Sequence, residues 1–268
     1  MLGLGYSGCY GSGMHSRVAE ERAEELRMQG FTVFEGLYDA RWVARMRGAI
    51  LGVYEEAGQP TCYSPQTQEH QTGLYVGPAG FAIPQLLPRL DPDERVAHPD
   101  VVDSLRAFLG EDMRLEIAGA VVSDASRPRF AWHNHVGGHD DGIYRQSGEW
   151  PVVDHGRRVM TLTYLQDLDE DHGPLQLQPH RVGEASAPPH DPRLSHWPRE
   201  VVLRPRAGSL VVIEECTWHA VLAATKNDKR IFVGLAYASA SAELGGWADA
   251  AVGDVGAYHN DPLLRSLL

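Results

Sequence analysis

Cysteine is scarce in this chain of 268 residues, and its three copies, Cys9, Cys62 and Cys216, are scattered. An odd, dispersed set excludes a disulfide framework and a zinc site of paired cysteines, and it is typical of the reducing cytoplasm. Long apolar runs are also missing. No stretch of about 18 apolar residues could span a membrane, and no basic segment followed by an apolar one indicates a secretion signal.

Positive charge is in deficit as well. Lysine and arginine number 24 against 36 aspartates and glutamates, so the formal net charge is −12. This balance disfavours nucleic acid and anionic membrane surfaces as partners. The length suits one domain with a sizeable core. We expect a flexible, glycine-rich segment over residues 1–15, with Met1 or Met14 as the true start, and a single domain over residues 16–268.

The spacing of apolar residues changes along the chain from helical to strand-like. It predicts helices within 16–30, 39–58 and 98–110, whereas residues 60–97 have no period and are expected to be loops. Helices first and then many short strands indicate a mainly β fold, a closed or sandwiched antiparallel sheet with helices packed outside. The expected strands cover residues 31–34, 115–121, 130–135, 159–165, 175–177, 201–203, 210–213 and 231–237.

Two histidines, two residues apart, end the predicted strand 130–135. Side chains alternate along a strand, so His133 and His135 would share a face, with Asn134 opposite and their Cα atoms roughly 6 to 7 Å apart. Two imidazoles placed in this way can bind one metal ion. A third ligand must come from elsewhere, and the best candidate is His219, which follows Trp218 near the end of a later apolar run.

Several short motifs follow one another in a characteristic order. They are Gly30-Phe31, His98-Pro99, Trp132-His133, His172-Gly173-Pro174-Leu175, Gln178-Pro179-His180-Arg181, Ala207-Gly208-Ser209-Leu210, Trp218-His219 and Arg230. Together, over about residues 20–240, they resemble the phytanoyl-CoA dioxygenase family of non-haem iron, 2-oxoglutarate-dependent oxygenases. The resemblance implies a double-stranded β-helix, the cupin-like jelly roll, with one Fe(II) at the open end of the barrel. It also implies 2-oxoglutarate and O₂ as cosubstrates and a small molecule as substrate.

The sequence departs from that family at one metal-ligand position. The family's motif is His-x-Asp, whereas here His135 stands where the carboxylate would be. The resemblance so modified implies His133, His135 and His219 as the ligands. The metal would then keep one more unit of positive charge than in the usual triad of two histidines and a carboxylate. A nearby carboxylate could serve instead, and the candidates are Asp140, Asp141, Glu214 and Glu215.

The resemblance also implies where 2-oxoglutarate binds. Arg230 follows His219 by eleven residues, as in the family, and a planar guanidinium suits a bidentate pair with the distal carboxylate. Thr161 and Thr163 belong to a strand that lines the cosubstrate pocket in the family. Either could donate its hydroxyl there, and otherwise both are β-favouring residues of a sheet.

Three functions remain open on the sequence. The first is an iron oxygenase that uses 2-oxoglutarate and O₂ to hydroxylate, desaturate or rearrange a small, natural-product-type molecule. The second is a three-histidine metal dioxygenase that does not use 2-oxoglutarate. The third is a non-catalytic binding protein with a degenerate site. Arg230 favours the first over the second, and the imidazole gained at position 135 argues against the third. The chain could be a monomer or a homodimer.

Overall fold

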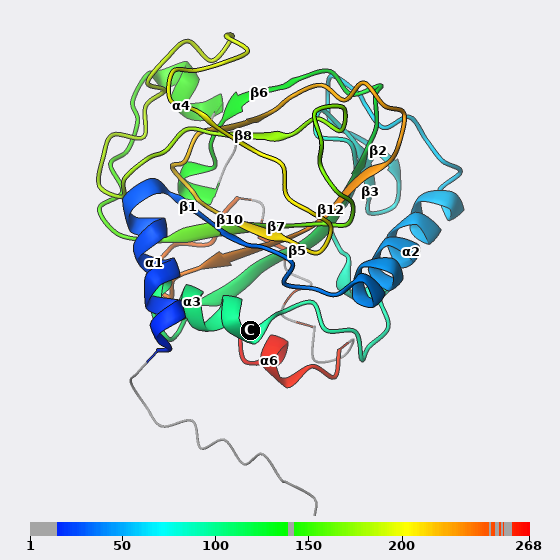
Figure 1. Cartoon of the computed structure of the whole chain (residues 1–268), viewed down its shortest axis with the longest axis horizontal. Coiled ribbons are helices and arrows are strands. Elements are labelled where there is room, and N and C mark those ends of the chain that lie inside the picture. Colours follow the sequence, from blue (N-terminus) through cyan, green and yellow to red (C-terminus); the bar gives the residue numbers. More distant parts are fainter. Residues whose placement is uncertain (1–14, 139–141, 247, 250–251, 253, 255–258) are drawn as a thin grey trace, which may run out of the picture.

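The computed structural model describes residues 15–138, 142–246, 248–249, 252, 254 and 259–268. Two antiparallel β-sheets face each other, and the N-terminal helices lie outside them (Figure 1). The predicted flexible segment 1–15 falls outside the described residues except for His15. None of the helices in the described ranges is long and apolar enough to cross a membrane.

Three helices lie where the apolar spacing predicted them, and their ends follow from the capping residues. Ser16 accepts a hydrogen bond from the Ala19 backbone N–H, and Asp39 accepts one from that of Trp42. Gly30 ends the first helix in the left-handed conformation, at φ 78°. The helices join one apolar core with the larger sheet. They are α1 (Arg17–Gln29), α2 (Ala40–Glu56) and α3 (Pro99–Leu109).

The larger sheet has eight strands within the described residues, in the order β1-β10-β7-β12-β5-β4-β3-β2. Its central pair, β12 with β5, begins where Arg230 lies opposite Ser123 and ends where Ala238 lies opposite Arg114. The strands are β1 (Phe31–Phe34), β2 (Gln68–Gln71), β3 (Leu74–Val76), β4 (Phe81–Ile83), β5 (Arg114–Ser123), β7 (Arg158–Tyr164), β10 (Leu210–Glu214) and β12 (Arg230–Ala238).

The smaller sheet has the order β6-β11-β8-β9. A second apolar core, which includes Phe31, Leu162, Leu177 and Val221, lies between the two sheets. This arrangement confirms the predicted mainly β, jelly-roll fold. The strands of this sheet are β6 (Phe130–His133), β8 (Leu175–Leu177), β9 (Val201–Leu203) and β11 (His219–Val221).

The prediction of loops throughout residues 60–97 is wrong. Strands β2, β3 and β4 extend the larger sheet beyond β5, and a short 3-10 helix, η1 (Leu87–Arg89), follows them. The residues of β2 are all exposed, and β3 and β4 have three residues each, so none carries a readable period. Three further short elements had not been predicted: η2 (Val136–Gly138), α4 (Gly142–Ser147) and α6 (Pro262–Arg265).

Candidate metal and cosubstrate site

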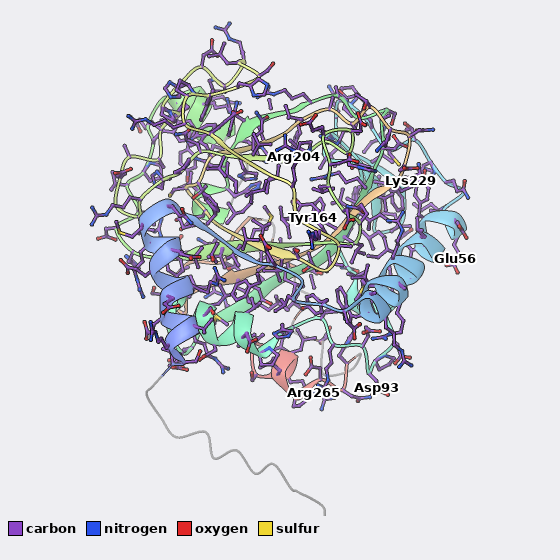
Figure 2. The ribbon with its side chains drawn as sticks, viewed as in Figure 1. Glu56, Asp93, Tyr164, Arg204, Lys229 and Arg265 are labelled. Carbon is purple, nitrogen blue, oxygen red and sulfur yellow. The ribbon has the colours of Figure 1, made fainter. Side chains whose placement is uncertain are left out.

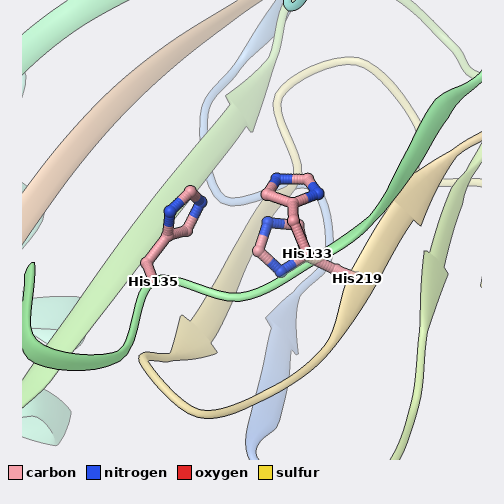
Figure 3. A group of neighbouring side chains, drawn as sticks. All are labelled: His133, His135 and His219. Carbon is pink, nitrogen blue, oxygen red and sulfur yellow. The ribbon is translucent and has the colours of Figure 1, made fainter. Parts of the chain in front are cut away.

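Three histidines meet at one end of the β6–β11 pair (Figure 3). His133 ends β6 and lies opposite His219, the first residue of β11, while His135 follows after the strand has ended. Ring centroids are 4.1 Å apart for His133 and His219, and His135 lies 5.0 Å from each of them. One ligand atom from each residue lies within 4.8 Å of the other two. Metal–nitrogen bonds of about 2.1 Å need ligand nitrogens roughly 3 Å apart, so small ring rotations would allow joint coordination.

Two of these rings are held in the tautomer that binds a metal through Nε2. Nδ1 of His133 lies 2.8 Å from the backbone oxygen of Ala131, and Nδ1 of His219 lies 3.0 Å from that of Thr217. A carbonyl oxygen only accepts, so each Nδ1 carries the hydrogen and each Nε2 keeps its lone pair. Such hydrogen bonds to the second ring nitrogen are the usual support of metal-binding histidines.

Desolvation keeps the half-buried imidazoles of His133 and His135 neutral. Burial, together with a smaller effect of the positive charge of Arg145, lowers the pKa of His133 to about 4. The pKa of His135 falls well below its usual value, through burial first and then through the neighbouring histidines His219 and His133. Neutral imidazole is the metal-binding form, so His133 and His135 are ready to bind a metal at neutral pH.

Glu215 fixes the segment that carries His135. The backbone N–H of His135 donates to the backbone oxygen of Glu215 at 2.9 Å, and the N–H of Gly137 donates to its carboxylate at 2.7 Å. The same carboxylate lies 3.5 Å from Arg157 and 3.8 Å from Arg158. Gly137 has φ 75°, a conformation that glycine adopts without strain. Glu215 thus anchors the loop after β6 through its own paired charge.

Among the described residues, no carboxylate belongs to the cluster of three histidines. Glu214 is buried next to Glu215, and both effects raise its pKa to about 8, so it is mostly protonated at neutral pH. Its side chain groups with His180 and Cys216, a buried cluster that sequence reasoning did not find because its members are far apart in the chain or face the core. The remaining candidates, Asp140 and Asp141, lie outside the described residues.

The three histidines open onto a cavity of about 330 Å³ inside the barrel. Pockets with mostly apolar walls and a few convergent polar groups are typical of small-molecule sites. The apolar walls here come from both sheets and include Ile117, Val121, Phe130, Met160, Leu162, Val221 and Phe232. The polar groups at its wall are the three histidines together with Arg127, Arg158, Arg230, Glu214 and Glu215.

Arg230 is buried in the wall of this cavity, as the first residue of β12. Its guanidinium lies over the rings of Tyr164 and Phe232, at 5.2 and 5.7 Å from their centroids, and donates to the Tyr164 hydroxyl at 3.3 Å. Tyr164 lies in the interior of the molecule (Figure 2). Arg230 and the three histidines therefore share one cavity, although His219 and Arg230 are separated by the turn between β11 and β12.

Thr161 and Thr163 do not lie where a cosubstrate hydroxyl would be needed. Along β7 they alternate with Met160 and Leu162, which line the cavity, and so point to the opposite face of the sheet. The Thr161 hydroxyl donates to the backbone oxygen of Leu235 at 3.2 Å. Because β7 is buried on both faces, its sequence has no polar side to indicate which residues point inward. Their predicted cosubstrate role is thus not supported by their position.

Comparisons with known proteins place this fold among solved structures. No protein-family profile and no curated protein matches the sequence. The carbocyclase SnoK from nogalamycin biosynthesis, described as non-haem and α-ketoglutarate-dependent, matches with a TM-score of 0.59 at 18% identity, over 85% of this chain and 88% of its own. HygX from Streptomyces hygroscopicus, solved with nickel and 2-oxoglutarate bound, matches with a TM-score of 0.57 at 15% identity, over 82% and 87%. AviO1 from Streptomyces viridochromogenes Tue57 matches with a TM-score of 0.58 at 16% identity, over 87% and 99%. At these identities the similarity establishes the jelly-roll fold.

Proposed function

We propose that this chain is a metal-dependent oxygenase that uses 2-oxoglutarate and O₂ to oxidise a small molecule. One observation carries the proposal: a cluster of three histidines and a buried arginine open into the same cavity of a jelly roll. In this reading His133, His135 and His219 hold Fe(II), and Arg230 binds the distal carboxylate of 2-oxoglutarate. The solved structures with this fold include enzymes described as α-ketoglutarate-dependent and one with 2-oxoglutarate bound.

The donor set suits such a metal. Three imidazoles bind Fe(II), and equally Ni(II), Cu(II) or Zn(II), so iron is inferred from the fold's relatives, one of which was solved with iron bound. Bound iron would supply the redox chemistry that couples the two oxidations. In the overall reaction, 2-oxoglutarate and O₂ yield succinate and CO₂, and the second oxygen atom enters the substrate in a hydroxylation or leaves as water in a desaturation.

The walls of the cavity indicate the kind of substrate. They are mainly aliphatic and aromatic, so they would bind the apolar surface of a small molecule and keep bulk water away from the metal. Fold relatives include a carbocyclase and an epimerase from nogalamycin biosynthesis, and HygX has been solved with hygromycin B bound. We therefore propose a natural-product-type substrate, which the enzyme hydroxylates, desaturates or rearranges.

A second candidate function follows from the ligand set. Within the described ranges the cluster holds three imidazoles and no carboxylate, which also suits a dioxygenase whose substrate binds the metal directly without 2-oxoglutarate. Buried Arg230 favours the first function, because a guanidinium inside an apolar cavity needs an anion to offset its desolvation.

The test is to load purified, metal-free protein with Fe(II) and to measure succinate formed from 2-oxoglutarate in air. We expect succinate to form slowly without substrate and faster with a suitable one, and we expect one metal ion per chain. A protein that binds metal but neither binds nor consumes 2-oxoglutarate would instead support the second function. A protein that binds no metal would contradict both.

A further inference from the structure

A second buried arginine faces the same cavity as Arg230. Arg127 lies in the turn between β5 and β6 and is 1% exposed, against 3% for Arg230. Its guanidinium donates to the backbone oxygens of Pro128 and Leu222, both at 3.2 Å. Burial first, and then the charge of Arg230, lower the pKa of Arg127 to about 9, against a smaller opposite effect of Tyr164. Both guanidinium groups line the same cavity, and an arginine side chain keeps its charge at neutral pH.

Neither of these two charges is neutralised by a carboxylate in the described part of the chain. No carboxylate there contributes to the pKa of Arg127 or Arg230, and the Nε atom of each is buried without a hydrogen-bond partner. Two buried like charges at the wall of one low-dielectric cavity destabilise the fold unless an anion offsets them. The arrangement therefore indicates a binding site for an anion.

The chain segments around Arg127 and Arg230 also carry a cation that does have a carboxylate partner. Lys229, one residue before Arg230, lies 2.6 Å from the carboxylate of Asp124, three residues before Arg127. The Lys229 ammonium also donates to the Tyr54 hydroxyl at 3.2 Å. The chain thus provides a carboxylate for the lysine outside the cavity and none, among the described residues, for the two arginines inside it.

We propose that Arg127 and Arg230 together form a carboxylate-binding site, which under the function proposed above holds the distal carboxylate of 2-oxoglutarate between two guanidinium groups. The inference rests on that function, and it adds a binding residue that the family resemblance did not include. Arg127 takes the place that a threonine of β7 was predicted to fill. The Tyr164 hydroxyl accepts a hydrogen bond from the Arg230 guanidinium and so holds it in the cavity wall.

The test uses Ni(II)-loaded full-length protein and two keto acids, measured by isothermal titration calorimetry. 2-Oxoglutarate carries the distal carboxylate, and 2-oxovalerate has the same chain length without it. We expect Arg127→Met to reduce the preference for 2-oxoglutarate by roughly 10- to 100-fold, the usual effect of losing a charged hydrogen-bond partner, and to leave 2-oxovalerate binding unchanged. Lys229→Met is the matched control, since it removes an adjacent cation outside the cavity and should keep the preference.

Each other outcome overturns a defined part of the proposal. If Arg127→Met weakens the binding of both keto acids equally, Arg127 only supports the structure of the barrel. If Arg127→Met changes the binding of neither keto acid while Arg230→Met abolishes the preference for 2-oxoglutarate, Arg230 binds the carboxylate alone. The proposed function then stands without this inference. If the wild-type protein has no preference for 2-oxoglutarate, both fail. Thermal unfolding monitors the fold, and Arg127→Lys, which keeps the charge but loses the planar fork, should show an intermediate preference if Arg127→Met does not fold.

Discussion

His133 lies directly opposite His219 in the antiparallel β6–β11 pair, and the two side chains make the same kind of hydrogen bond. Each holds its Nδ1 against the backbone oxygen of the residue two positions earlier. The register of two short strands therefore sets both the distance between the rings and their tautomers. Metal bound here would link β6 to β11 and stabilise the smaller sheet.

Removal of any one of the three histidines should weaken metal binding. We expect His133→Ala, His135→Ala and His219→Ala each to lower Ni(II) affinity by more than the roughly 10- to 100-fold typical of losing a supporting hydrogen bond. His135→Asp should keep the metal, because it restores a carboxylate ligand. Calorimetry on metal-free protein measures this, with His155→Ala, an exposed histidine, as control. Full metal occupancy in His135→Ala would show that the third ligand lies elsewhere.

Arg230 should determine affinity for 2-oxoglutarate but not for metal. Arg230→Met removes the guanidinium from over the rings of Tyr164 and Phe232 and keeps an unbranched side chain in its place. We expect 2-oxoglutarate to bind roughly 10- to 100-fold more weakly, since a charge-assisted pair is lost. Ni(II) affinity should stay unchanged. Unaltered 2-oxoglutarate binding would favour the function that does without this cosubstrate.

Glu215 should act on the metal through the loop that it holds. Glu215→Ala removes the acceptor for the Gly137 N–H and the partner of Arg157 and Arg158. We expect about a tenfold loss of Ni(II) affinity, in the range of lost supporting contacts. Glu215→Gln keeps an acceptor oxygen and should lose less. A loss in Glu215→Gln as large as in His133→Ala would instead identify Glu215 as a ligand.

The half-buried, desolvated imidazole of His133 should make the metal-free protein sensitive to mild acid. The folded-state pKa of His133 is about 4, below its unfolded value of 6.5, so between these values the unfolded chain binds more protons. Stability therefore falls as the pH drops through this window. Urea unfolding at about pH 7 and about pH 5 measures the slope, which His133→Ala should reduce. By the same reasoning, metal binding should persist somewhat below pH 6.5 and be lost toward pH 4.

Substitution of Gly30 should destabilise the fold for two reasons, the positive φ of its backbone and the closeness of the Thr217 hydroxyl. Its φ is 78°, and an added Cβ would collide with the Thr217 hydroxyl, which donates to the Gly30 backbone oxygen at 3.0 Å. We expect Gly30→Ala to lower the free energy of unfolding by more than the about 1–3 kcal/mol of backbone strain alone. Gly36→Ala is the control, since Gly36 has φ 59° and open space around it. Equal losses in urea unfolding would mean that the Thr217 contact contributes nothing.

Local patterns were enough to predict much of the fold. Ser16 and Asp39 cap helices through their own side chains, and Gly30 ends a helix because it has no side chain. The ends of these helices could therefore be predicted from the sequence. The segments of β7, β10 and β12 are long enough to show strand composition. Exposed β2 and the three-residue strands β3 and β4 could not be recognised, because they form only by pairing with their neighbours along the edge of β5.

The spacing of two residues predicted that His133 and His135 lie close together, but the predicted strand 130–135 ends at His133, so the position of His135 also depends on the loop that Glu215 holds. The sequence by itself also determined that His219 and Arg230 were the candidates to join them, through the order of their motifs. Only the tertiary structure decided that Thr161 and Thr163 face away from the cavity, that Glu215 holds the His135 loop, and that Arg127 lines the same cavity as Arg230. These relationships depend on how the two sheets close around the cavity, and closure brings together residues that no local spacing connects.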